Sequence, residues 1–174
     1  MTILFTIVAI MQSFAISLGV GSSTLAIVNF FVAIADGNIE PSERRMMGVV
    51  YVVLRVAMIV ILVSTLILLA KQYAVTGFGS MSAFSIGQLV VILALFVNAM
   101  LMTAHMMPSN FGPALQAGSW YTLGTLAALV PLGLTGFDII EFFMGYITWL
   151  VLTVSIVNGV MAIQVGKRTN TITK

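Results

Sequence analysis

Arg55 is the side chain in this sequence with the strongest chemical consequence. It lies in an apolar run, residues 46–63, that holds no other charged residue. Such a run is typical of a bilayer span, where a guanidinium keeps its proton. A central arginine costs at least about 2.5–3.5 kcal/mol on insertion scales, so it normally faces a partner or a wet cavity. One interpretation is a polar cavity in which Arg55 binds an anion or an acidic ligand.

Polar side chains from other apolar segments are predicted at the depth of Arg55. Counting about 1.5 Å per residue from the helix ends places six of them near that level: Ser22, Ser23, Thr24, Asn98, Ser155 and Asn158. Their hydroxyls and amides are suited to solvate the guanidinium without a counter-charge. Glu141, about one turn inside the outer face, is the acid predicted to lie deepest within a span, and it would have to reach far towards Arg55. The alternative is a structural arginine that joins helices through these groups.

Small residues in the first apolar segment recur at a spacing of four. The pairs are Gly19 with Ser23, Ser17 with Gly21, and Ser22 with Ala26. Such pairs let helix backbones approach closely in lipid. Gly19, Gly21 and Ala26 are therefore predicted to pack against other helices.

His105 is the only histidine, and the chain has no cysteine. The absence of cysteine excludes thiolate metal sites, iron–sulfur clusters and cysteine nucleophiles, and a lone histidine excludes two-histidine metal sites within one chain. His105 could serve as a haem ligand or a proton relay. Because one histidine cannot fill both axial positions of a b-type haem, a methionine would have to be the second ligand. The alternative is an ordinary interfacial histidine, with no cofactor and no metal.

Composition places the chain in a membrane. Hydrophobic residues make up 60% and charged residues 7% of the 174, whereas a soluble domain carries roughly 25% charged residues. The net charge of +2 is not gathered in a basic cluster of the kind that binds nucleic acid. The bilayer is therefore the expected surrounding, and nucleic acid is not an expected partner.

Five apolar segments are long enough to cross about 30 Å of hydrocarbon. They are residues 3–33, 42–70, 84–107, 113–130 and 137–165, separated by segments rich in glycine, proline, serine and aspartate. The sequence thus predicts an all-α, polytopic transmembrane bundle of five spans. Residues 1–165 form this one domain, and 166–174 form a short polar cytoplasmic tail.

Basic residues predict the orientation of the bundle. With the N-terminus outside and the C-terminus inside, only Lys71 is external, and five basic residues are cytoplasmic: Arg44, Arg45, Lys167, Arg168 and Lys174. Cytoplasmic loops carry the excess of Lys and Arg in membrane proteins. We therefore expect an N-out/C-in, multi-pass protein of a bacterial-type inner (plasma) membrane.

Three short motifs carry a resemblance. Gly-Val-Gly-Ser-Ser-Thr at 19–24 is followed by Asn-Phe-Phe at 29–31 and a short acidic loop, and Ser-Trp-Tyr at 119–121 opens the fourth segment. With Asn98, this layout resembles a group of uncharacterised small multi-pass bacterial inner-membrane proteins. The resemblance implies the topology and no activity. The layout is also similar to haem- or copper-linked membrane bundles, but those rely on several helix histidines.

No carboxylate pair, nucleophile–base pair or metal cluster is visible in the sequence, so we do not expect an enzyme. The leading hypothesis is a non-enzymatic subunit or assembly partner of a membrane complex, packed against other subunits or copies of itself. The first alternative is a small transporter or channel with a polar site around Arg55. The second is a membrane redox protein with haem at His105.

Overall fold

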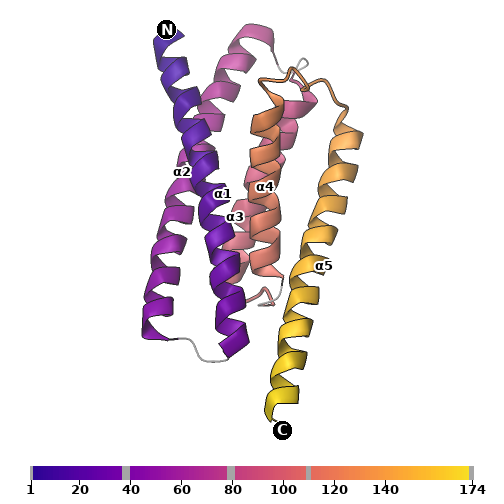
Figure 1. Ribbon diagram of the computed structural model, residues 1–174. Coiled ribbons are helices and arrows are strands. Elements are labelled where there is room, and N and C mark those ends of the chain that lie inside the picture. Colours follow the sequence, from indigo (N-terminus) through magenta and orange to yellow (C-terminus); the bar gives the residue numbers. More distant parts are fainter. Residues whose placement is uncertain (1, 37–39, 78–80, 109–110, 173–174) are drawn as a thin grey trace.

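The computed structural model is all-helical, as the sequence predicted, and it describes residues 2–36, 40–77, 81–108 and 111–172. In this part of the chain, five helices alternate in direction (Figure 1): α1 (Thr2–Asp36), α2 (Pro41–Thr76), α3 (Ala83–Thr103), α4 (Gly112–Leu129) and α5 (Ile139–Ile172). The start of α2 and the end of α5 share one end of the bundle, which we call the lower end. The N-terminus lies at the opposite, upper end.

Local signals set the helix boundaries. Pro41 occupies the first turn of α2, and the Glu43 carboxylate accepts a hydrogen bond from the Glu40 N–H at 3.0 Å in a capping box. Gly77 ends α2 with φ +74, a backbone region that suits glycine. The Ser82 hydroxyl caps α3 by accepting from the Ser85 N–H. These caps account for where α2 and α3 begin.

Several helix ends differ from the sequence-based prediction, and α1 continues past residue 33 to Asp36. α2 continues beyond residue 70 to Thr76, and α5 runs through the predicted polar tail as far as Ile172. α3 stops at Thr103 instead of residue 107, because His105 adopts a left-handed φ of 56° that a helix cannot continue. The end of the predicted tail, residues 173–174, lies outside the described residues.

α4 is the inner helix of the bundle. It packs against α1, α3 and α5 and buries a series of small and large side chains: Gly112, Ala114, Ala117, Gly118, Ser119, Trp120, Leu123 and Leu126. Within the described residues, the other four helices are long and apolar enough to cross a membrane. α4 is shorter and less apolar because protein surrounds it on several sides, so that small and polar residues replace lipid-facing ones.

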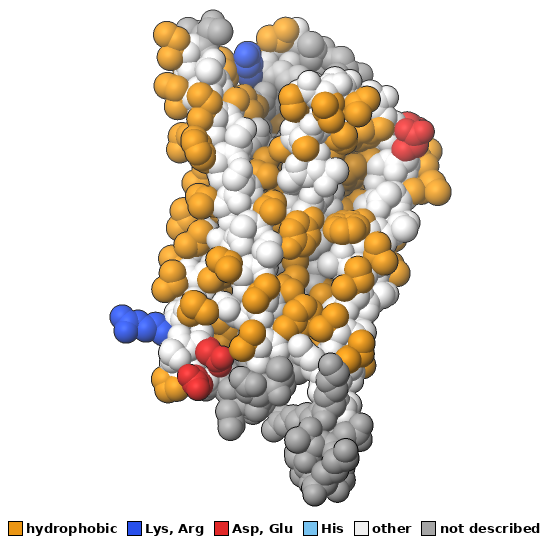
Figure 2. All heavy atoms as spheres, in the orientation of Figure 1, with side chains coloured by type: hydrophobic (Ala, Val, Ile, Leu, Met, Phe, Trp, Pro, Cys, Tyr) orange, Lys and Arg blue, Asp and Glu red, His pale blue; other side chains and the backbone are white. Residues whose placement is uncertain are grey.

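The outer surface has the distribution of side chains that is typical of a membrane protein. Figure 2 shows apolar side chains along the whole visible face and charged ones only towards its two ends. Large apolar residues on all four long helices are exposed, among them Phe14, Val56, Val97 and Ile147. Exposed apolar surface on this scale requires a partner other than water, which supports the placement in a membrane.

Hydrogen bonds join the helices at several levels. The Gln12 amide donates to the Thr65 hydroxyl at 2.7 Å and joins α1 to α2. The Ser85 hydroxyl donates to the Gln72 side-chain oxygen at 2.9 Å and joins α3 to α2 at the upper end. Polar side chains commonly link helices in this way in lipid. The second bond lies near the upper end of α2 and α3.

Gly19 and Gly21 differ sharply in their surroundings, although both were predicted to pack against other helices. Gly19 is buried against the indole ring of Trp120, and a Cβ added there would overlap the ring. Gly21 lies on an exposed face, with nothing within 4 Å of an added Cβ. The close approach of α1 to α4 therefore depends on Gly19.

We expect Gly19→Ala and Gly21→Ala to have opposite effects on stability. The first forces Trp120 or the α1–α4 contact to move and should lower stability by about 1–3 kcal/mol. The second places alanine in an open helical position and should be neutral or stabilising by up to about 1 kcal/mol. Thermal unfolding in mild detergent, followed by tryptophan fluorescence, measures both. Equal effects of the two substitutions would contradict the α1–α4 packing.

Candidate ligand site at Arg55

Arg55 lines a cavity of about 390 Å³ in the lower half of the bundle. The first half of α2 and the end of α3 form two of its walls, and α1 and α4 form the others. The polar residues of the lining are Ser23, Tyr51, Arg55, Thr103, His105 and Gln116. The cavity thus brings together polar groups from four parts of the sequence that are far apart along the chain.

Helix geometry explains why Arg55 faces this cavity. Met47, Tyr51, Leu54 and Met58 share the lining with it, at the spacing of three and four residues that marks one helix face. Side chains on a helix lean towards its N-terminus, which for α2 is the lower end. The Arg55 side chain is exposed in the isolated chain. It therefore lies at the open side of the cavity rather than in the closed core.

The outward face of α2 next to Arg55 is apolar. Val52, Val56 and Ile59 each expose more than half of their surface. In a bilayer these side chains would contact lipid tails, where a cation is strongly disfavoured. Arg55 thus stands on the border between a lipid-facing strip and a polar cavity, and the cavity is the more favourable surrounding for its charge.

Ser23 and Gln116 supply hydrogen-bonding capacity that the protein does not use. Ser23 is only 2% exposed, and its hydroxyl has no hydrogen-bond partner in the described part of the chain. The Gln116 amide nitrogen reaches only the Met58 sulfur, at 3.5 Å, which is a weak acceptor. A buried polar group without a partner costs about 1–3 kcal/mol. Both groups are therefore available to a ligand that can accept hydrogen bonds.

Asn98 lies outside the cavity lining and bonds to residues of α4, the helix that forms one wall of the cavity. Its amide nitrogen donates to the Gly112 carbonyl at 2.9 Å and to the Gln116 side-chain oxygen at 3.0 Å. These bonds tie α3 to the first turns of α4. They also orient the Gln116 amide so that its nitrogen is directed to the cavity side, next to Met58. Asn98 is thus a positioning residue for Gln116 and does not itself line the cavity.

Arg55 has no counter-charge among the residues that the structure describes. Within the described part of the chain it makes no hydrogen bond or ion pair, and no carboxylate lines its cavity. Glu141, the one acid that was considered as a partner, instead accepts a hydrogen bond from the Asp138 N–H at 3.0 Å at the start of α5. An Arg55–Glu141 pair therefore does not form, because Glu141 caps its own helix near the upper end.

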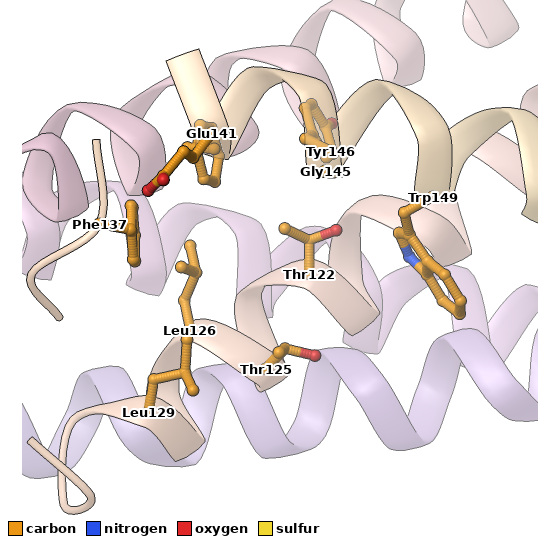
Figure 3. A pocket seen from close by; sticks show the side chains of 10 residues that line it. Thr122, Thr125, Leu126, Leu129, Phe137, Glu141, Gly145, Tyr146 and Trp149 are labelled. Carbon is orange, nitrogen blue, oxygen red and sulfur yellow. The ribbon is translucent and has the colours of Figure 1, made fainter. Parts of the chain in front are cut away.

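Glu141 belongs to a second cavity, also of about 390 Å³, between α4 and α5. Figure 3 shows Glu141 and Phe137 at one end of it and Trp149 at the other. The polar groups there already have partners. The Tyr146 hydroxyl bonds Ser119 at 2.8 Å, and the Trp149 indole N–H donates to the Gly118 carbonyl at 3.0 Å. This cavity is thus a less favourable site for a polar ligand than the one at Arg55.

The remaining predicted polar residues do not line the Arg55 cavity. Thr24 is exposed and bonds the Tyr121 hydroxyl at 2.8 Å, which joins α1 to α4. Ser22 is buried and Asn158 is half-buried, but neither contributes to the lining. Ala26, which was predicted as a packing residue, does line it. Only Ser23 of the three consecutive hydroxyls therefore shares the cavity with Arg55.

Gln116 was missed from the sequence, although a signal for it exists. It is the only amide side chain in the fourth apolar segment, 113–130. An amide in such a segment has to find a partner within the protein. The depth argument that selected Asn98 does not select Gln116, which lies only a few residues into the predicted segment. An inventory of every amide in the predicted spans would have found it.

His105 lies just beyond the end of α3, where it is exposed and lines the lower part of the cavity. Three methionines, Met47, Met58 and Met102, share this lining. Haem ligation by His105, which the sequence offered as an alternative to an interfacial histidine, stays untested. Its position shows only that the imidazole stands close to the open end of the Arg55 cavity.

The chain matches no protein-family model, no curated protein and no solved structure. The chemistry of the cavity at Arg55 is therefore the basis on which a function can be argued.

Asn98→Leu should weaken the bundle. The substitution removes the bonds to the Gly112 carbonyl and the Gln116 oxygen, and leaving the Gln116 oxygen without this donor is expected to lower stability by about 1–3 kcal/mol. Asn158→Leu is the matched control, because Asn158 is half-buried outside this network. Thermal unfolding of the two variants in the same detergent makes the comparison. If Asn98→Leu unfolds at the temperature of the control, the α3–α4 connection does not depend on Asn98.

Proposed function

We propose that this chain is a non-enzymatic integral membrane protein that binds an anionic ligand at Arg55. The observation that carries the proposal is the unpaired Arg55 guanidinium in a cavity that also holds the unpartnered Ser23 hydroxyl and the Gln116 amide. A cation and two further donors around one space are complementary to an anion. A bound anion would also remove the cost of an uncompensated charge next to lipid.

In this proposal the chain crosses a bacterial-type inner membrane five times, with the N-terminus outside. Arg44 and Arg45 lie at the start of α2 at the lower end, and residues 167 and 168 lie near the end of α5 at the same end. Lys71 lies near the upper end of α2. The excess of basic residues on the lower side supports a cytoplasmic lower end. α4 would cross as an inner helix, shielded from lipid by its neighbours.

The closed core above the cavity favours a binding site over a continuous pore. Ile61 follows Met58 by one turn of α2, and Leu95 precedes Asn98 by one turn of α3. Both side chains are 0% exposed. The cavity is thus closed towards the upper half of the bundle and reaches the lower end beside His105. A transporter would need a second conformation that opens the upper half.

A role as a complex subunit is the second candidate, and one surface of α1 favours it. Ala9, Ser13, Ser17 and Gly21 follow one another at a spacing of four, and all four are exposed. Several of them form a shallow groove beside Phe14. Small residues on a lipid-facing strip allow the helix of another chain to approach closely. A partner subunit or a second copy could therefore pack along this strip.

Replacement of Arg55 tests the anion site. Anions should raise the unfolding temperature of the wild type, and the two probes are inorganic phosphate and dodecyl phosphate. Arg55→Gln should abolish this shift, and Arg55→Lys should keep part of it because the charge remains. Lys71→Gln, which removes a charge near the upper end, is the control and should respond like the wild type. A shift that survives in Arg55→Gln would refute the site.

The same variants separate a binding arginine from a structural one. Without ligand, Arg55→Gln should unfold at or above the wild-type temperature, because it removes a charge that has no partner within the described residues. A structural arginine that joins helices would instead lose bonds, and its replacement would lower the unfolding temperature.

Ser17→Leu tests the subunit role. Leucine would fill the small-residue strip of α1 and prevent close approach of another helix, so cross-linking in native membranes should lose the adducts formed by the wild type. Val28→Leu, on an exposed part of the same helix, is the control and should retain them. A wild-type protein that is a stable monomer without adducts in native membranes would count against this role.

A further inference from the structure

We infer that the ligand of the Arg55 cavity is an anionic amphiphile, with one acyl chain and a phosphate or carboxylate head. The inference rests on the proposed anion site and adds the chemical class of its ligand. The head would accept bonds from Arg55, Ser23 and Gln116, and the chain would lie among the apolar side chains of the cavity. Three observations support it.

The first observation is the composition of the lining. Apart from its few polar groups, the cavity is lined by apolar side chains, including Phe30, Leu54 and three methionines. Such a lining gives a ligand with an apolar part a surface to pack against, and the few placed polar groups bind its head. Methionine adapts readily to a flexible chain because it is unbranched and polarizable.

The second observation is the opening of the cavity. α2 and α3 are joined at the upper end by the Gln72–Ser85 hydrogen bond, whereas the cavity lies between their lower halves. Arg55 is exposed at this side, beside the apolar strip of Val52 and Val56. A ligand could therefore enter sideways from the bilayer as well as from the lower end. Lateral entry suits a molecule that is already dissolved in lipid.

The third observation is the Ser23 hydroxyl, which is independent of the charge on Arg55. It is 2% exposed, lines the cavity and has no partner. Serine hydroxyls on helices are commonly satisfied by a carbonyl one turn earlier, as the Ser17 hydroxyl is by the Ser13 carbonyl at 3.0 Å. The Ser23 hydroxyl makes no such bond to a carbonyl among the described residues. Its hydroxyl is thus free to donate to a head group held by Arg55.

The size of the cavity limits the ligand to one chain. A volume of about 390 Å³ lies near the lower end of the roughly 300–1,000 Å³ range for small-molecule pockets. One acyl chain fits this space better than the two chains of a diacyl lipid. The ligand class is therefore a single-chain anionic amphiphile from the cytoplasmic side of the membrane.

Tryptophan fluorescence offers a direct test. The chain has two tryptophans, so Trp149→Phe leaves Trp120 as the only one. Trp120 follows the cavity residues Gln116 and Ala117 by about one turn of α4. Dodecyl phosphate with a brominated chain should therefore quench Trp120 saturably in the full-length protein in a neutral detergent. Unlabelled dodecyl phosphate should reverse the quenching, and inorganic phosphate should do so only at a much higher concentration.

Variants in the same background assign the contacts. Arg55→Gln should weaken binding about 10- to 100-fold, and Arg55→Lys should restore most of it. Ser23→Ala should weaken binding about 2- to 10-fold, yet raise the unfolding temperature of the ligand-free protein because it removes an unsatisfied buried hydroxyl. A merely structural serine would not combine weaker binding with higher stability.

The outcomes separate this inference from the proposed function. If inorganic phosphate displaces the brominated probe as well as dodecyl phosphate does, the amphiphile is wrong and the anion site stands. If dodecylphosphocholine, which has no net charge, binds equally and Arg55→Gln changes nothing, both are wrong. A third outcome would overturn the amphiphile alone. In it, the brominated probe causes no saturable quenching in the wild type or in Arg55→Lys, but inorganic phosphate stabilises the wild type and not Arg55→Gln.

Discussion

An uncompensated guanidinium in an apolar helix is the constraint on which the account of this protein depends. Burying a cation without a partner is among the most costly arrangements in a membrane, and no described carboxylate lines the cavity of Arg55. The protein reduces the cost by placing Arg55 beside a cavity instead of among lipid tails. The Ser23 hydroxyl and the Gln116 amide in that cavity leave donors unused, which adds a second cost. A bound anion would relieve both.

The rest of the fold makes this cavity possible. Gly19 allows α1 and α4 to approach closely around Trp120, and Asn98 ties the start of α4 to α3. The Gln72–Ser85 bond closes the upper contact of α2 and α3, and the core around Ile61 seals the bundle above the site. The close α1–α4 contact and the cavity between the lower halves of α2 and α3 therefore follow from a few residues, most of them small or polar.

Much of the fold could be predicted from the sequence, because long apolar runs have few structural alternatives in a membrane protein. The helix ends were harder: α3 stops at Thr103 because of the backbone conformation of His105, which leaves no mark in hydropathy. The depth of Arg55 could be counted, but the rotation of each helix could not. For that reason Ser22, Ser23 and Thr24 were equivalent in sequence, whereas only Ser23 lines the cavity.

Glu141 is a second residue whose contacts could not be predicted from its depth in the membrane. Its charge suggested a partner for Arg55, whereas its position three residues after Asp138 indicates a helix cap, and the structure shows the capping bond. Gln116 is the opposite case, because its sequence signal was present and was not used. An amide in an apolar segment indicates a partner within the protein. Local spacing and an inventory of every polar group in the spans would have improved the predicted site.

A density map of the native particle, extracted with its own lipids, tests the central claim most directly. The account predicts non-protein density in the cavity, with a head group in contact with the Arg55 guanidinium and the Ser23 hydroxyl. A map in which Arg55 pairs with a carboxylate of this chain, or extends into the lipid layer beside an empty cavity, would contradict it.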